Sequence, residues 1–178
     1  MYMKIFLIAG HHNADPGAVN STEKESDLTK ELRGLIHDAI RELNPSVQII
    51  LDYDADTLPQ VISKVNREIQ DGDILIDVHF NSFSNGSATG AEVLVKNGSP
   101  NLVRAAVYSK IIANTIGIKD RGAKTEAQSH RSKLPILHGN GSRYLFEVCF
   151  MSNSVDMEKY HSRKLELAKN LASEILNG

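Results

Sequence analysis

The sequence contains one cysteine, no tryptophan and no cluster of lysine and arginine residues. Cys149 alone excludes an intramolecular disulfide framework and a zinc knuckle built from several cysteines. The 20 basic and 22 acidic residues leave a net charge of −2 over 178 residues. An extended phosphate-binding surface is therefore not expected, and neither is a nucleic-acid partner.

Long hydrophobic runs are also missing from the sequence. The apolar run at residues 5–9 is too short for the apolar region of a signal peptide. It also falls far below the ~20 apolar residues that a membrane-spanning helix needs. We therefore expect a soluble protein that is made in the cytoplasm without a visible signal peptide and that has no membrane-inserted segment. A monomer is also expected.

Short apolar runs alternate with helical periods along the chain. The spacing of Leu28, Leu32 and Ile36 predicts a helix, which Asn44-Pro45 ends. The same criteria predict helices at 25–43, 58–69, 101–116 and 157–176, and strands at 4–9, 47–51, 74–79, 91–96 and 144–148. Residues 119–141 are expected to be mostly polar loop. This alternation predicts one α/β domain over residues 1–178, with a twisted, mainly parallel (mixed) sheet and helices on both faces.

Four chemically reactive side chains fall where the predicted strands end. His11 follows the first strand, His79 ends the third, and Glu147 lies near the end of the last. Glu25 stands where the first loop enters its helix. Open α/β sheets bind ligands outside the carboxyl ends of their strands, so we expect these four side chains to meet at one edge.

Two imidazoles and one carboxylate suit a zinc ion that keeps a fourth position open for water. Such a site lowers the pKa of the bound water to roughly 7, and a further carboxylate can take the water's proton. Any single histidine at a strand end has an alternative role as a hydrogen-bonded structural residue. Spacing alone therefore leaves both interpretations open.

The residues around these four positions form four motifs in a fixed order. They read Gly10-His11-His12-Asn13-Ala14-Asp15-Pro16-Gly17-Ala18, Glu25-Ser26-Asp27-Leu28-Thr29, His79-Phe80-Asn81-Ser82 and Leu145-Phe146-Glu147-Val148-Cys149-Phe150-Met151-Ser152-Asn153. Together they resemble the zinc-dependent N-acetylmuramoyl-L-alanine amidases of the amidase 3 type. Arg121-Gly122-Ala123-Lys124 also falls where that family has a similar loop. The resemblance spans residues 5 to about 175.

The resemblance implies a function and a set of site residues. His11, Glu25 and His79 would be zinc ligands, Glu147 the catalytic acid/base, and Asn81 a substrate-binding residue. The family cleaves the amide between N-acetylmuramic acid and the L-alanine of the peptidoglycan stem peptide. The expected cofactor is therefore Zn²⁺, the expected partner is peptidoglycan, and the expected place of action is the bacterial cell wall, reached by phage release or by secretion.

Some positions depart from the family pattern. His12 stands where the family usually has glycine, Asp77 where it usually has serine, and His138 where arginine is common. Asp77 shares a strand face with His79, and it could either orient a neighbour or only cap polar backbone groups. Glu23 is a rival to Glu25 as a ligand, but the Asp-x-Thr that follows Glu25 fixes the register. Glu92 is expected at solvent or at the edge of the site and is left out of it.

The remaining candidates have simpler interpretations. His37, His130 and His161 lack a partner motif and are expected at the surface, and Cys149 is expected in the core rather than as a nucleophile. Two other functional classes stay open. One is a different zinc amidohydrolase, such as a carboxypeptidase or a deacetylase. The other is a non-catalytic module that binds the cell wall, although the retained ligands and Glu147 argue against it.

Overall fold

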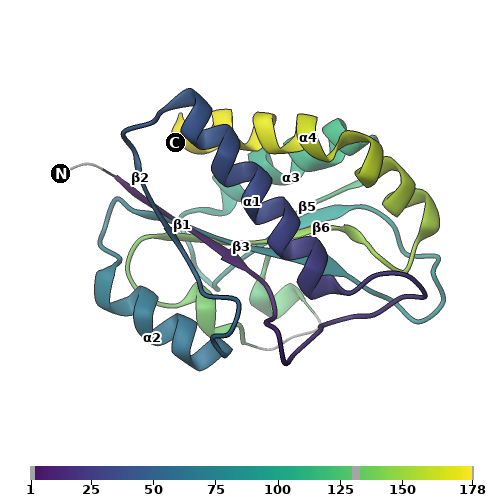
Figure 1. The fold of residues 1–178 in the computed structure, drawn as a ribbon, viewed down its shortest axis with the longest axis horizontal. Coiled ribbons are helices and arrows are strands. Elements are labelled where there is room, and N and C mark those ends of the chain that lie inside the picture. Colours follow the sequence, from purple (N-terminus) through teal and green to yellow (C-terminus); the bar gives the residue numbers. More distant parts are fainter. Residues whose placement is uncertain (1–2, 130–132, 178) are drawn as a thin grey trace.

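The computed structural model describes residues 3–129 and 133–177, which form one six-stranded sheet covered by helices (Figure 1). The strands are β1 (Lys4–Ala9), β2 (Gln48–Leu51), β3 (Ile74–Asn81), β4 (Ala91–Val95), β5 (Asp120–Thr125) and β6 (Ser142–Phe150). Their spatial order is β2-β1-β3-β6-β4-β5. All neighbouring strands are parallel except β4 and β6, which are antiparallel. The predicted mixed, mainly parallel sheet is confirmed.

Helices cover the two faces of the sheet unequally. The longer helices α1 (Glu25–Leu43), α3 (Leu102–Ile116) and α4 (Ser154–Leu176) pack on one face. The short helix α2 (Leu58–Glu68) and the 3-10 turn η2 (Pro135–Leu137) pack on the other, as Figure 1 shows for α2. Each face has its own apolar core, because side chains alternate along every strand. The prediction of helices on both faces is therefore confirmed.

The alternation leaves part of the α2 face of the sheet for polar residues. Phe6, Leu75 and Leu145 meet α2 and η2 near the start of their strands. Further along β3 on the same face, Asp77, which lies across from Leu145, and then His79, which lies across from Glu147, follow Leu75. The apolar cover thus ends where the predicted site begins.

One prediction about the fold is wrong. Residues 120–125 were expected in a polar loop, but they form the edge strand β5, which pairs in parallel with β4. β5 is the last strand of the sheet, so its outer edge has no neighbouring strand, and its side chains are exposed or only partly buried. Such a strand does not need an apolar pattern, and the sequence Asp-Arg-Gly-Ala-Lys-Thr has none. The last helix also begins earlier than expected, at Ser154, because the side chain of Asn153 caps it by accepting from the backbone N–H groups of Val155 and Asp156.

Within residues 3–129 and 133–177, the structure has no helix that is both long enough and apolar enough to cross a bilayer. The helix α4, with 23 residues, is the longest by its bounds, but it alternates charged and apolar positions and buries one side against α1 and α3.

Candidate metal centre

Three side chains from three elements meet at the carboxyl edge of the sheet. His11 follows β1, Glu25 is the first residue of α1, and His79 lies near the end of β3. The Thr29 hydroxyl donates to the carbonyl of Gly10 at 2.7 Å, which ties the first turn of α1 to the end of β1. One potential ligand atom from each of the three side chains lies within 4.8 Å of the others. The structure thus brings together the three predicted ligands.

The Glu25 carboxylate lies between the two imidazoles. Its Oε2 is 3.0 Å from Nε2 of His11, and its Oε1 is 3.1 Å from Nδ1 of His79. The backbone N–H groups of Ala18 and Phe80 also donate to the carboxylate, at 3.0 and 3.1 Å. These two backbone donors fix the orientation of Glu25 independently of the histidines.

Each imidazole also has an aspartate at the ring nitrogen that points away from Glu25. Asp15 Oδ2 is 3.0 Å from Nδ1 of His11, and Asp77 Oδ2 is 3.2 Å from Nε2 of His79. When these aspartates accept an N–H, the opposite nitrogen of each ring keeps its lone pair and faces Glu25. His11 Nε2 is buried and, although close to Glu25, makes no hydrogen bond of acceptable geometry within the described part of the chain. That nitrogen has the surroundings of a metal ligand.

The pKa values show how strongly these groups interact. Burial would lower the pKa of His11, but the neighbouring Glu25 carboxylate outweighs burial and raises it. Burial likewise opposes charge on His79, yet Asp77 and Glu25 raise its pKa well above the ordinary value. Burial would raise the pKa of Glu25, but the two histidines hold it far below its usual range. The metal-free site therefore attracts positive charge, and a bound cation would displace protons.

The backbone near the site is strained and closely packed. His11 has a φ of 68°, the only positive φ at a non-glycine position among the described residues. Gly17 has a φ of 65°, and a Cβ there would lie 2.6 Å from Oε2 of Glu25. A Cβ on Gly10 would collide with the ring of His79. Both glycines are needed for the imidazoles and the carboxylate to come together.

Glu147 and Asn81 lie beside this cluster. Glu147 pairs across the sheet with His79 on β3 and with Glu92 on β4, so these three side chains form a row on one face. Only 8% of the Glu147 surface is exposed. Asn81 is on β3, two residues after His79, and its Nδ2 lies 3.4 Å from Oε1 of Glu92. Glu147 can thus face a group bound at the cluster, although the cluster itself consists of His11, Glu25 and His79.

The rival candidates lie outside the cluster. His12 accepts from the backbone N–H of Ala14 at 3.2 Å, and Glu23 pairs with His161 at 2.9 Å. His138 pairs with the buried Glu126 at 3.0 Å, which supports the turn η2. His37 pairs with its neighbour Asp38.

The expected surface and core positions can be compared with the structure. His161 is exposed and His37 partly so, in line with the surface positions expected for them, whereas His130 lies outside the described residues. Cys149 is fully buried, as predicted.

Comparison with known proteins identifies the family. Residues 5–178 match the amidase 3 family model, described as N-acetylmuramoyl-L-alanine amidase. The chain belongs to the amidase 3 family. The amidase CwlM of Bacillus licheniformis is 26% identical over 166 residues, which cover 90% of this chain and 61% of CwlM. The chain thus spans less than two thirds of that relative's length.

Solved structures show the same amidase fold. The N-acetylmuramoyl-L-alanine amidase from Clostridium difficile 630 superposes with a TM-score of 0.84 at 20% identity, covering 99% of this chain and 96% of that one. The amidase AmiC2 of Nostoc punctiforme superposes with a TM-score of 0.76 at 22% identity, covering 98% and 96% of the two chains. At these identities the likeness establishes the fold class.

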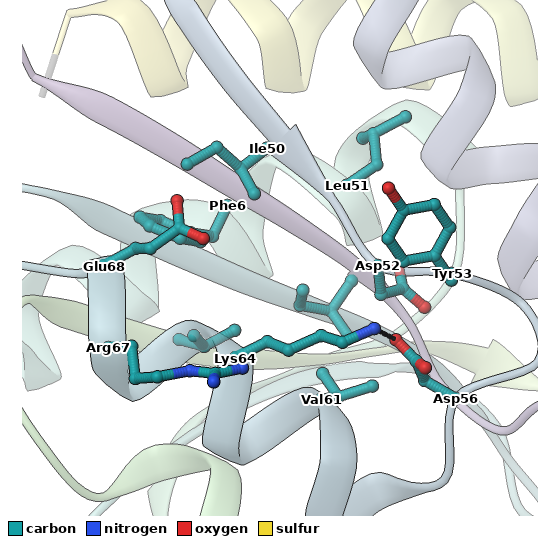
Figure 2. A pocket seen from close by; sticks show the side chains of 12 residues that line it. Phe6, Ile50, Leu51, Asp52, Tyr53, Asp56, Val61, Lys64, Arg67 and Glu68 are labelled. Carbon is teal, nitrogen blue, oxygen red and sulfur yellow. Dashed lines mark hydrogen bonds and ion pairs between the residues drawn. The ribbon is translucent and has the colours of Figure 1, made fainter.

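Two cavities adjoin on the α2 side of this amidase fold. One, of about 240 Å³, is lined by His11, Asp77 and His79. The other, of about 330 Å³, lies between β1, β2 and α2 (Figure 2). Among its lining residues, Lys64 binds the Asp56 carboxylate at 2.6 Å and lies over the ring of Tyr53 (Figure 2). The two cavities share lining residues, namely Ile8, Asp56 and Val61.

The sequence did not indicate one buried charged group near the cluster. Glu92 was expected at solvent or at the edge of the site, but only 5% of its surface is exposed, and Arg121 and Lys124 bind it. These two cations come from β5, the strand that the sequence did not predict. The resemblance of Arg121-Gly122-Ala123-Lys124 to a family loop was the only signal in the sequence that could have located them.

Proposed function

We propose that the chain is a zinc-dependent N-acetylmuramoyl-L-alanine amidase. It hydrolyses the amide that joins N-acetylmuramic acid to the L-alanine of the peptidoglycan stem peptide. The observation that carries this proposal is the convergence of His11, Glu25 and His79, with Glu147 on the adjacent strand, in a chain that matches the family over residues 5–178.

The donor set supports zinc as the metal. Two imidazole nitrogens and a carboxylate are a common ligand set for catalytic zinc, which keeps a fourth position open. The fixed orientation of both rings by Asp15 and Asp77 is typical of histidines that bind zinc. Bound zinc would supply Lewis acidity, which polarises the scissile carbonyl and activates water.

Glu147 has the position required of the acid/base. It lies across from His79 on the next strand, so its carboxylate can take a proton from the attacking water. It can then give that proton to the departing α-amine of L-alanine, so that hydrolysis yields a carboxylic acid and an amine. Asn81 lies two residues beyond His79 and would contact the substrate. We propose that the enzyme acts as a monomer on peptidoglycan in the bacterial cell wall.

Digestion of purified peptidoglycan tests this proposal. The chain with zinc should release new L-alanine N-termini and no new reducing sugar ends. New reducing ends would indicate a glycosidase, and released D-alanine would indicate a carboxypeptidase. Acetate release without peptide cleavage would indicate a deacetylase. Binding to the wall without any product would indicate a non-catalytic module, and each of these four results contradicts the proposal.

A further inference from the structure

A third cavity, of about 260 Å³, lies on the other side of Glu147 from the α2 cavities. It lies over β4 and β5 and is lined by Asn81, Glu92, Arg121, Lys124 and Phe150, among others. Glu92 pairs directly with Glu147 across the sheet, so this cavity adjoins the row that contains His79. It is the most cationic of the cavities near the proposed metal centre, since two basic side chains face one carboxylate.

The two cations are held in place by a single buried carboxylate. Glu92 Oε2 accepts from Nε of Arg121 at 2.7 Å and from Nζ of Lys124 at 2.5 Å. Its other oxygen accepts from Asn81. The guanidinium of Arg121 also stacks on the ring of Phe150, 4.9 Å from its centroid. About a quarter of each cationic side chain is exposed, so both are ordered yet accessible.

These side chains have hydrogen-bonding capacity left for a ligand. Arg121 uses Nε for Glu92, and the described residues offer no acceptor to its two terminal nitrogens. Lys124 carries three N–H donors and binds one carboxylate oxygen. A planar guanidinium next to an ammonium and an amide suits a carboxylate, which accepts several charge-assisted hydrogen bonds. Because Glu92 already fixes both cations, a ligand loses little free energy in ordering them.

The cavity lies at a fixed distance from the proposed scissile bond. Neighbouring strands are ~4.8 Å apart, so Glu92 on β4 is two strand spacings, or about 10 Å, from His79 on β3. An extended peptide advances at most ~3.6 Å per residue, so two stem residues span about 7 Å from the scissile amide of L-alanine. The remaining ~3 Å is one hydrogen-bond length, and the side chains of Arg121 and Lys124 reach back from β5 to Glu92, so the second stem residue can bind them.

The chemistry of the substrate decides which end of it enters this cavity. The lactyl carboxyl group of N-acetylmuramic acid is consumed in the scissile amide, so the glycan side of that bond has no carboxylate. Carboxylates occur on the stem peptide. Resting on the proposed amidase function, we propose that Asn81, Arg121 and Lys124 form a subsite for the free α-carboxylate of the second stem residue. The peptide then extends over β4 and β5, and the glycan lies toward α2.

Two synthetic substrates that differ in one group test the subsite. They are N-acetylmuramoyl-L-alanyl-γ-D-glutamyl peptides in which the glutamyl α-carboxyl group is either free or a carboxamide. We expect the wild-type chain to show a kcat/KM at least about tenfold higher for the carboxylate. Arg121→Gln and Lys124→Met should each reduce that ratio about tenfold, mostly through KM. The matched control is Lys119→Met, an exposed lysine just before β5 that should keep the wild-type ratio.

The outcomes separate the subsite from the amidase function. Equal kcat/KM for both substrates in the wild-type chain, or equal losses on both in the variants, would overturn the subsite and leave the amidase function standing. Failure to cleave either substrate would overturn the amidase function. In that case, calorimetry with the free L-alanyl-γ-D-glutamyl peptide decides the subsite. A tenfold lower affinity for this peptide in Arg121→Gln supports the subsite. An unchanged affinity in Arg121→Gln overturns it.

Discussion

The Asp77 carboxylate lies 3.2 Å from Nε2 of His79. His79 follows Asp77 by two residues on the same face of β3. Because it occupies that nitrogen, it leaves Nδ1 of His79 to face Glu25 and a bound metal. Only 2% of the Asp77 surface is exposed, so water does not replace this contact easily. The departure from the serine usual in the family therefore has a structural consequence: a carboxylate now orients the imidazole of His79, which we propose as a zinc ligand.

Asp77→Asn should weaken zinc binding about 10- to 100-fold, since the amide no longer fixes the ring by accepting a charge-assisted N–H bond. Competition with a chromophoric chelator measures this affinity without reference to activity. The control is Asp73→Asn just before β3, where the carboxylate accepts from the backbone N–H groups of Lys4 and Gln70 at the opposite end of the strand from His79. That variant should lose stability and keep its zinc affinity. Unchanged affinity in Asp77→Asn would show that Asp77 does not orient the ligand.

Glu92→Gln should make stability less dependent on pH. Burial would raise the pKa of Glu92, but Lys124 and Arg121 hold it below its ordinary value. A carboxyl group with a lowered pKa in the folded state stabilises the fold above its unfolded pKa of about 4.3, and this contribution is lost as the pH falls. The variant should therefore be about 1–3 kcal/mol less stable at pH 7.

Urea unfolding at pH 7, 5 and 3.5 measures this difference. The gap between wild type and Glu92→Gln should shrink below about pH 5. Glu42→Gln on the exposed side of α1 should stay within about 0.5 kcal/mol of wild type. A gap for Glu92→Gln that is the same at all three pH values would mean that the Arg121 and Lys124 contacts do not stabilise the charged form.

Gly17→Ala should damage both the fold and the metal centre. Its φ of 65° disfavours any side chain, and its Cβ would press on the Glu25 carboxylate and the His11 ring. Gly98→Ala is a matched control, because Gly98 has a φ of 69° and open space around it. Both variants should lose about 1–2 kcal/mol of stability from the backbone. Only Gly17→Ala should also lose zinc affinity; equal zinc affinity in the two variants would contradict this packing argument.

Glu147→Gln should separate catalysis from metal binding. Removal of a positioned acid/base costs about 10²–10⁴-fold in rate, whereas the ligands remain in place. We expect full zinc content, near-wild-type thermal stability and at least a ~10²-fold lower turnover, measured on purified cell walls. Loss of zinc would make Glu147 a fourth ligand. An undiminished rate would assign the acid/base role to another residue.

The sequence could predict the parts of the fold that repeat a period. The short apolar runs of β1 and β3 and the helical stripe of α1 indicated their elements directly. They also placed His11, Glu25 and His79 at one edge, since parallel strands share that edge. The strand β5 has no such period, and its pairing with β4 depends on tertiary contacts. Because β5 was missed, the ion pairs of Arg121 and Lys124 with Glu92 were missed with it.

The zinc content of purified His79→Ala tests the metal centre most directly. Elemental analysis after dialysis should find one zinc ion per chain in the wild type and in a His37→Ala control. The imidazole of His37 pairs with Asp38 on α1, away from the cluster. His79→Ala should lose stoichiometric zinc, because only one imidazole and one carboxylate would remain. Undiminished stoichiometric zinc in His79→Ala would contradict the assignment of His11, Glu25 and His79 as the metal centre.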